Sequence, residues 1–258
     1  MIRTLFIIAG AALVLAMASI GGALALGGRD LAAHGWAWTL RDGDGDTVRF
    51  ERVNTSQSRG PITTRTLAWS GDDRLTLSLP ADVEYVQGAQ AGVVVTGPKS
   101  VVDSIRIRNG EIDMDSRTEV VTFGWDSNGL TAVSDQERLK IVVTAPSVTR
   151  FDLDSSGELS IRNYDQPTLT LNISGSGSAT AQGRTTRLAV DVSGSGEADL
   201  SRLTTTDASV EVSGSGEVTT APTGEADVEI SGSGDVTLTQ KPARQTVAIS
   251  GSGEVHGG

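Results

Sequence analysis

One tetrapeptide, Ser-Gly-Ser-Gly, recurs at nearly constant spacing through the C-terminal half of the 258-residue chain. The copies begin at Ser174, Ser193, Ser213, Ser231 and Ser250, so successive copies are 19, 20, 18 and 19 residues apart. A degenerate copy, Asp154-Ser-Ser-Gly-Glu158, lies 20 residues upstream of the first. A repeat of this length is one supersecondary unit that cannot bury its apolar face alone, so equivalent units must stack on one another.

Apolar and polar residues alternate on both sides of each copy, as they do in strands with one buried face. Leu188, Val190 and Val192 lead into the second copy, and Ala198 and Leu200 follow it. Stacking equivalent strands about 4.8 Å apart gives each strand a parallel neighbour and closes an apolar interior. Only one corner per coil has a fixed motif, and coil length varies by two residues. The sequence therefore predicts an all-β fold, a right-handed single-stranded parallel β-helix of about six coils over residues 151–258.

The glycines of each corner are the predicted structural residues of this β-helix. Stacked corners bring backbones close together, and glycine allows a positive φ and has no Cβ that could clash. The serine hydroxyls are expected to form ladders between coils. The corner glycines are Gly175, Gly177, Gly194, Gly196, Gly214, Gly216, Gly232, Gly234, Gly251 and Gly253.

Two upstream regions are strand-like but have no constant period, so they predict an irregular β cap. Residues 29–74 form a juxtamembrane region with a hairpin turn at residues 42–46, where aspartate and glycine alternate. Residues 75–150 form an entry region, whose sharpest hairpin signal is Asn109-Gly110. Phe151, at the start of the first coil, is bulkier than its later equivalents, so we expect it to plug the end of the β-helix.

The first segment, residues 1–28, is a signal anchor or a signal peptide. The run from Thr4 to Gly28 is uncharged and long enough, as a helix, to cross a hydrocarbon core of about 30 Å. Arg3 on its short side favours a cytoplasmic N-terminus. The alternative is cleavage after Ala16-Met-Ala18, which resembles a signal-peptidase site. Both interpretations place residues 30–258 in the cell envelope, as the periplasmic part of a single-pass inner-membrane protein or as a protein secreted to the periplasm.

Composition excludes several function classes. The net charge of −11 argues against nucleic acid as a partner, because an acidic chain gains nothing from counterion release. The absence of cysteine excludes disulfides, thiolate nucleophiles and cysteine-bound zinc. Only two histidines are present, which excludes a histidine-rich metal site. We predict no cofactor.

An acidic residue follows most of the corners, and these residues should stack into a column. Like charges would then lie about 5 Å apart, which makes the column a weak candidate for cation binding. The simpler interpretation is a solvated face that discourages lateral aggregation. The column consists of Glu158, Glu197, Glu217, Asp235 and Glu254.

No enzyme motif is recognisable. The acidic turn at residues 42–46 lacks the glycine and glutamate that a calcium-binding EF-hand loop requires, since Thr47 and Val53 occupy those positions. Neither histidine has a serine and a carboxylate in a triad-like context. We therefore predict that the protein is not an enzyme and has no catalytic residue.

These features resemble the putative auto-transporter adhesin head domain family, also called the GIN domain. The resemblance rests on the serial Ser-Gly-Ser-Gly-Glu/Asp corners from Ser174 to Glu254, on the strand from Leu139 to Pro146, and on the segment from Leu75 to Met114. Together they cover about residues 75–256. The resemblance implies a right-handed β-helix exported to the cell envelope, with an adhesive or surface role and no catalytic residue.

The predicted function is therefore an exported, envelope-associated structural or adhesive module without catalytic activity. Alternatives are a ligand-binding sensor that acts through its N-terminal membrane helix and, less favoured, a polysaccharide-acting β-helix enzyme. The expected partner is an envelope protein or a surface polysaccharide. Val247, Ile249 and Val255 have no following coil, so the edge of the C-terminal coil predicts a contact with a second copy or with a partner.

Overall fold

The structure, a computed structural model, describes residues 37–41, 47–52, 61–114, 118–126, 129–134 and 139–257. These residues form two compact units, each of which is described by itself. The predicted membrane segment and the acidic turn at residues 42–46 lie outside the described residues. Within the described part of the chain, no helix is both long enough and apolar enough to cross a membrane.

The first unit is a four-stranded sheet with the strand order β1-β2-β9-β10. β1 (Ala37–Arg41) pairs antiparallel with β2 (Thr47–Arg52), in agreement with the predicted hairpin. β2 pairs parallel with β9 (Thr118–Asp126), and β10 (Gly129–Ser134) completes the sheet. The sheet thus joins a segment near the N-terminus to a segment that is inserted between two strands of the second unit.

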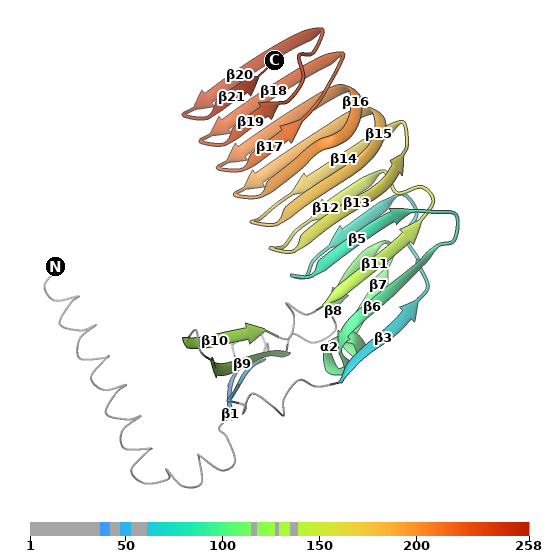
Figure 1. The fold of residues 1–258 in the computed structure, drawn as a ribbon, viewed down its shortest axis with the longest axis vertical. Coiled ribbons are helices and arrows are strands. Elements are labelled where there is room, and N and C mark those ends of the chain that lie inside the picture. Colours follow the sequence, from blue (N-terminus) through green and yellow to red (C-terminus); the bar gives the residue numbers. More distant parts are fainter. Residues whose placement is uncertain are drawn as a thin grey trace, which may run out of the picture. The chain divides into compact units, whose positions relative to one another are not determined.

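The second unit is a parallel β-solenoid whose coils stack along one axis (Figure 1). Each coil contributes one strand to each of two walls, which meet at the Ser-Gly-Ser-Gly corner. The first wall contains β4 (Arg74–Leu77), β12 (Arg150–Leu153), β14 (Thr168–Ile173), β18 (Glu225–Gly232) and β20 (Arg244–Gly251). The second wall contains β5 (Asp82–Gln87), β13 (Glu158–Asp165), β17 (Glu217–Thr220), β19 (Asp235–Leu238) and β21 (Glu254–Gly257).

Two long strands, β15 (Ser178–Gly194) and β16 (Glu197–Gly214), contribute to both walls. Their first halves lie in the second wall and their second halves in the first wall, since Ala179 pairs with Leu159 and Leu188 pairs with Leu169. Both strands therefore continue through the second corner of a coil, the corner without a glycine motif. This continuity explains why the sequence marks only one corner per coil.

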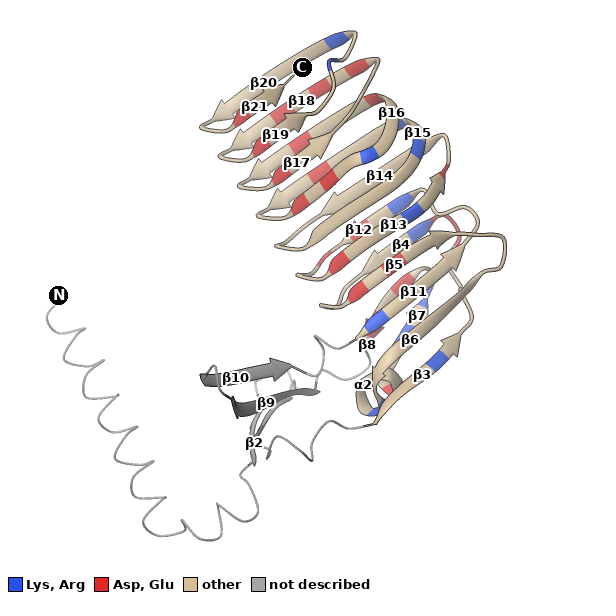
Figure 2. Ribbon diagram, viewed as in Figure 1, with Lys and Arg blue, Asp and Glu red and all other residues tan. Residues whose placement is uncertain are grey.

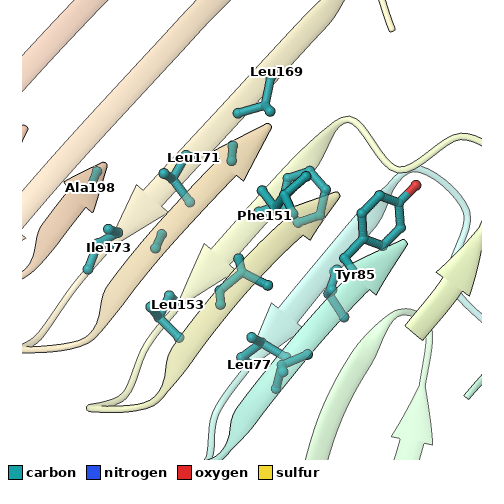
Figure 3. Packing of buried hydrophobic residues seen from close by; sticks show 14 of the residues in the cluster. Leu77, Tyr85, Phe151, Leu153, Leu169, Leu171, Ile173 and Ala198 are labelled. Atoms are coloured by element: carbon teal, nitrogen blue, oxygen red, sulfur yellow. The ribbon is translucent and has the colours of Figure 1, made fainter. Parts of the chain in front are cut away.

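Equivalent residues of successive coils stack directly on one another, and their side chains fill the interior (Figure 3). This arrangement confirms the prediction of an all-β fold made of stacked coils. Each fully buried aliphatic side chain contributes about 1.5–3 kcal/mol relative to an exposed one, so the long rows of buried residues are the main stabilising feature. One such row of the first wall is Leu75, Phe151, Leu171, Val190, Val210 and Val228.

The coils at the N-terminal end do not follow the order of the sequence. The coil formed by β4 and β5 lies between β12 and β13 on one side and β8 (Glu111–Met114) and β11 (Lys140–Ala145) on the other. Residues 74–87, which the sequence analysis assigned to an irregular region, therefore form a regular coil. Phe151 is not a plug at the end of the solenoid, because this earlier coil packs beneath it.

Antiparallel strands and one short helix cover the N-terminal end of the solenoid. β6 (Gly92–Pro98) pairs antiparallel with β11, and β3 (Ile62–Leu67) pairs antiparallel with β6. The helix α2 (Lys99–Ser104) buries Val101 and Val102. β7 (Ile105–Arg108) and β8 form the hairpin predicted at Asn109-Gly110, where φ is 51° and 83° as a type I′ turn requires.

The two glycines of each corner are required for different reasons. Gly214 has a φ of 129°, and a Cβ at this position would lie 2.4 Å from the carbonyl oxygen of Gly194 in the neighbouring coil. Gly216 has no positive φ, but a Cβ there would lie 2.5 Å from Cγ1 of Val192. The first glycine thus needs both its backbone conformation and its lack of a side chain, whereas the second needs only the space.

Backbone hydrogen bonds join successive corners, and the expected contacts of serine hydroxyls are found at the first corners, where Ser174 Oγ donates to Asp154 Oδ1 at 2.7 Å and Ser155 Oγ donates to the carbonyl oxygen of Leu79 at 3.0 Å. The amide of Ser215 donates to the carbonyl oxygen of Gly194 at 2.8 Å, and the amide of Glu217 donates to that of Gly196 at 3.0 Å. The amide of Ser233 repeats the first contact one coil further on, at 2.7 Å to Gly214. From Gly194 onward, close approach of glycine backbones therefore provides the bonds between corners that were expected from hydroxyl groups.

Candidate functional site

The predicted acidic column forms on the outside of the second wall. Strand pairing places Glu197, Glu217, Asp235 and Glu254 in consecutive register, one residue per coil. Glu158 is separated from them by Ser178, which occupies the same row in the intervening coil. Pairing thus brings together the five residues in the order that the sequence predicted.

The acidic column is a solvent-exposed row. All five carboxylate residues are exposed, and Asp235 Oδ1 accepts a hydrogen bond from the backbone amide of Glu254 at 3.0 Å. Among the residues that the structure describes, no three acidic or histidine side chains are grouped so that they could hold a metal ion. Figure 2 shows the acidic residues as separate red segments on successive strands of the ribbon. The column therefore supplies a line of negative charge.

A second row of carboxylates lies on the outside of the first wall and was missed by the sequence analysis. Asp191, Glu211 and Glu229 are in consecutive register, and all three are exposed. They lie two residues before the first serine of their corners, a constant offset in the repeat that could have identified them. The first wall therefore carries its own row of negative charge.

A shallow depression of about 430 Å³ runs along the first wall beside this row. Its floor includes the small residues Ala189 and Ser209, which occupy one row, and it is flanked by charged residues of both signs. Charged and polar side chains that border it are Thr168, Thr170, Arg187, Asp207, Glu225 and Asp227. The depression exists because two adjacent coils place small side chains between larger ones.

A half-buried ion pair joins the coil of β4 and β5 to the coils that follow it. Asp152 is nearly buried, with a side chain that is 7% exposed, and its Oδ2 accepts a hydrogen bond from Arg74 Nε at 2.6 Å. Its Oδ1 accepts a hydrogen bond from Asn172 Nδ2 at 2.5 Å. The three side chains come from three successive layers of the first wall. Their bonds fix the register of a junction at which the chain order and the spatial order differ.

Three aromatic rings fill the interior at the same junction. The ring of Phe151 packs edge-on against Tyr85 at 5.0 Å and against Tyr164 at 6.1 Å between centroids. The Tyr85 hydroxyl donates to the carbonyl oxygen of Ala145 at 2.9 Å, and the Tyr164 hydroxyl donates to that of Thr168 at 2.5 Å. Burial raises the pKa of Tyr85 to about 12 and raises the pKa of Tyr164 still further. Both hydroxyls thus stay protonated at neutral pH and have a structural role.

Other polar contacts of carboxylates lie on the outer faces. Arg184 binds both carboxylate oxygens of Asp165, at 2.7 and 2.6 Å, and this contact lowers the pKa of Asp165. Hydrogen bonds from Ser201 lower the pKa of Asp199. These shifts favour the charged forms of both carboxylates, which suits solvated surface groups more than general acids or bases.

The outer faces of the two walls thus present rows of carboxylates and hydroxyl groups that are accessible to a ligand.

A family model described as putative auto-transporter adhesin, head GIN domain, matches residues 73–242. No curated protein matches the chain. Among solved structures, a putative adhesin from Bacteroides fragilis has 17% sequence identity and a TM-score of 0.59, over 77% of this chain and 97% of its own. At this identity the likeness shows the fold alone.

Two further solved structures are similar in extent. A putative lipid binding protein from Parabacteroides distasonis has 18% identity and a TM-score of 0.46, and a putative adhesin from Parabacteroides merdae has 12% identity and a TM-score of 0.49. Each match covers 80% of this chain and 98% of the other chain. The family model itself spans about two thirds of the chain, from the coil of β4 and β5 to just beyond β19. The chain therefore belongs to the auto-transporter adhesin head (GIN) domain family.

Proposed function

We propose that this protein is an exported, envelope-associated solenoid that acts as an adhesive module without catalytic activity. The observation that carries the proposal is the periodic outer face of the first wall. The row Asp191, Glu211 and Glu229 repeats the same chemistry at steps of about 4.8 Å beside a continuous depression. A repetitive ligand can engage several coils at once, and such multivalent contact strengthens adhesion without a deep pocket.

The charge of this face selects the kind of ligand. Carboxylates outnumber cations along the depression, so a neutral or cationic surface fits and a strongly anionic polymer is repelled. A surface polysaccharide with hydroxyl or amino groups meets this requirement, and so does a basic envelope protein. Nucleic acid does not, because its phosphates would face a net charge of −11.

The proposal includes the position of the protein in the cell. The uncharged run of residues 4–28 would act as a single-pass inner-membrane anchor, with the solenoid in the periplasm. A right-handed winding of the solenoid is part of the same proposal. Parallel strands of one wall, such as β12 and β14, are joined by crossovers, and such connections are right-handed in about 98% of cases.

The adhesive face can be tested with two triple variants of the full chain. The variant Asp191→Asn, Glu211→Gln, Glu229→Gln neutralises the first wall, and the control Glu197→Gln, Glu217→Gln, Asp235→Asn removes the same charge from the second wall. Binding would be measured to immobilised neutral polysaccharide, to amino-sugar polysaccharide and to a basic envelope protein fraction. The first variant should lose most of its binding, while the control should keep it.

The outcomes separate the parts of this proposal. Equal loss in both triple variants would mean that net charge alone drives binding and that no adhesive face exists. No binding of the unmodified chain to any of the three surfaces would refute adhesion. A reporter that functions only in the cytoplasm, fused after Gly258, should be inactive, and Met1 should be the N-terminus of the mature protein if the segment is an anchor. An N-terminus at Ser19 would show a cleaved signal peptide instead.

A further inference from the structure

The C-terminal end of the solenoid exposes its apolar interior. Val247 and Ile249 of β20 are 41% and 46% exposed, whereas Val228 and Ile230, which occupy the same rows one coil earlier, are at most 1% exposed. Every residue of β20 is exposed, and β20 and β21 form the last layer of the stack (Figure 1). An apolar surface of this kind normally marks an interaction site.

The same end presents two unprotected strand edges. Among the described residues, β20 pairs only with β18 and β21 only with β19. Natural edge strands are usually blocked by proline, by bulges or by inward-pointing charges. The inward positions of β20 hold Gln245, Val247 and Ile249, with no charge among them. Nothing in the strand therefore prevents pairing with another chain.

The opposite end of the solenoid is covered by an antiparallel layer whose outer edge is β3. β6 and β3 pair antiparallel along the last layer there, and α2 buries Val101 and Val102. The edge strand β3 carries Arg65, whose Nη1 donates to the carbonyl oxygen of Val102 at 3.4 Å. The two ends therefore differ, and contact between two equal C-terminal ends closes under a two-fold axis, whereas contact between unlike ends would propagate into a filament.

The rows of carboxylates on the first wall stop at the terminal strand. Glu229 is followed in its row by Ala248, Asp227 by Thr246, and Glu225 by Arg244. Figure 2 shows this change as acidic segments along β18 and a basic segment on β20. Two copies of an acidic chain would repel each other most through rows of carboxylates about 5 Å apart. On the first wall the terminal strand β20 removes that repulsion, whereas on the second wall Glu254 of β21 still continues the acidic column.

We propose that the terminal coil is the interface of a homodimer in which two solenoids meet end to end through β20 and β21. The open end has two strand edges and an apolar strip formed by Val247 and Ile249. The same end of a second copy presents the same edges and the same strip. A two-fold axis brings Val247 and Ile249 of both copies together and lets the free backbone groups of β20 and β21 pair. The contact closes on itself, so it yields a dimer and not a fibre.

The first test is the mass of the full chain in a mild detergent, measured by sedimentation. The variant Ile249→Asp places a charge in the apolar strip, and the matched control Ile62→Asp makes the same change at an exposed isoleucine of the covered end, on β3. The unmodified chain and Ile62→Asp should be dimers. Ile249→Asp should raise the dissociation constant of the dimer at least about a hundredfold, since it forces a desolvated charge into the contact.

A second measurement tests the location without disturbing the strip. The chain has no cysteine, so a single cysteine reports one position only. In the full chain, Ala248→Cys on β20 should form a dimer with a short bifunctional maleimide, whereas Thr66→Cys on β3 should not. A monomeric unmodified chain at high concentration would overturn the proposal. So would equal effects of Ile249→Asp and Ile62→Asp, or cross-linking through Thr66→Cys alone, because these results would place the contact elsewhere.

Discussion

The coils after Thr168 and the coils before Leu153 have the same architecture but are specified differently. In the C-terminal coils, each strand stacks on the strand that lies one repeat earlier in the sequence, and glycine corners set the register. In the N-terminal coils, β4 and β5 stack between strands from distant parts of the chain. The same stacked geometry can therefore arise from a periodic sequence or from specific side-chain contacts between segments far apart.

The contacts at the junction are of a kind that the later coils lack in the described residues. Asp152 bonds to both Arg74 and Asn172 across three layers, and Phe151 packs against two buried tyrosines. In the later coils, equivalent positions of successive coils instead hold identical or similar residues, and backbone bonds between corner residues join the corners. The comparison suggests that unique polar and aromatic contacts replace periodicity where the chain order is broken.

The largest effect is expected from a side chain at a glycine corner. Gly214→Val combines an unfavourable φ of 129° with a Cβ that would lie 2.4 Å from the Gly194 carbonyl oxygen. Neither backbone can move without breaking the Ser215-to-Gly194 bond. The free energy of unfolding should fall by about 3 kcal/mol or more, measured by chemical denaturation.

Two controls accompany this corner variant. Gly92→Val changes a strand glycine around which a Cβ would meet nothing within 4 Å, so it should be tolerated. Ser215→Ala removes an exposed hydroxyl and should cost less than about 1 kcal/mol. If Ser215→Ala destabilised the protein more than Gly214→Val, the account of the corner as a backbone contact would be wrong.

The aromatic junction predicts a loss of stability at alkaline pH. The folded-state pKa of Tyr85 is about 12, above the ordinary value of 10, because the hydroxyl is buried. A raised pKa means that its contribution to stability is complete below pH 10 and is lost as the pH rises toward 12. The chain contains only two tyrosines, so the ultraviolet absorbance of tyrosinate reports this junction alone.

In a pH titration, tyrosinate should appear together with unfolding between pH 10 and 12. The same titration in concentrated denaturant should have its midpoint near 10, the value of a free tyrosine. Ionisation of both tyrosines near pH 10 in a chain that is still folded would mean that the rings are not packed as described.

The sequence predicted the parts of the fold that periodicity encodes. The corners from Ser174 to Glu254 gave the stacking, the parallel register and the acidic column, because each coil repeats the residues of the last. The hairpin at Asn109-Gly110 was also predicted, since that dipeptide suits a turn with two positive φ values. These features depend on neighbours along the chain or on a constant spacing.

The remaining features depend on contacts that spacing does not reveal. Leu75, Leu77 and Val83 alternate like any strand residues, and nothing near them indicates that they stack beneath Phe151, Leu153 and Leu159. The pairing of Arg74 with Asp152 joins residues 78 positions apart. The depression on the first wall arises from Ala189 and Ser209 in one row, which becomes visible only when the register is known.

The ion pair between Arg74 and Asp152 should contribute less to the free energy of unfolding than a corner glycine does. Asp152→Ala removes a nearly buried carboxylate and leaves Asn172 without that partner, whereas Arg74 can turn to solvent because it is half exposed. The expected loss is about 2 kcal/mol in the free energy of unfolding. Asp165→Ala is the matched control, since Asp165 makes two equally short bonds to Arg184 but is exposed. The control should change little, and equal effects would show that burial does not decide the strength of these pairs.

The smallest effect is expected from the acidic column, which periodicity produces without any specific partner. Glu217 lies in register between Glu197 and Asp235, so Glu217→Gln removes two like-charge neighbours and should raise the melting temperature by about 1–2 °C at low salt. Ser178→Glu places a carboxylate in the row between Glu158 and Glu197 and should lower the melting temperature by a similar amount. Both shifts should vanish in about 1 M salt, where the Debye length falls to about 3 Å. A decrease on Glu217→Gln would instead indicate that the carboxylate has an attractive partner, such as a bound cation, and the column could no longer be described as a solvated row of charge.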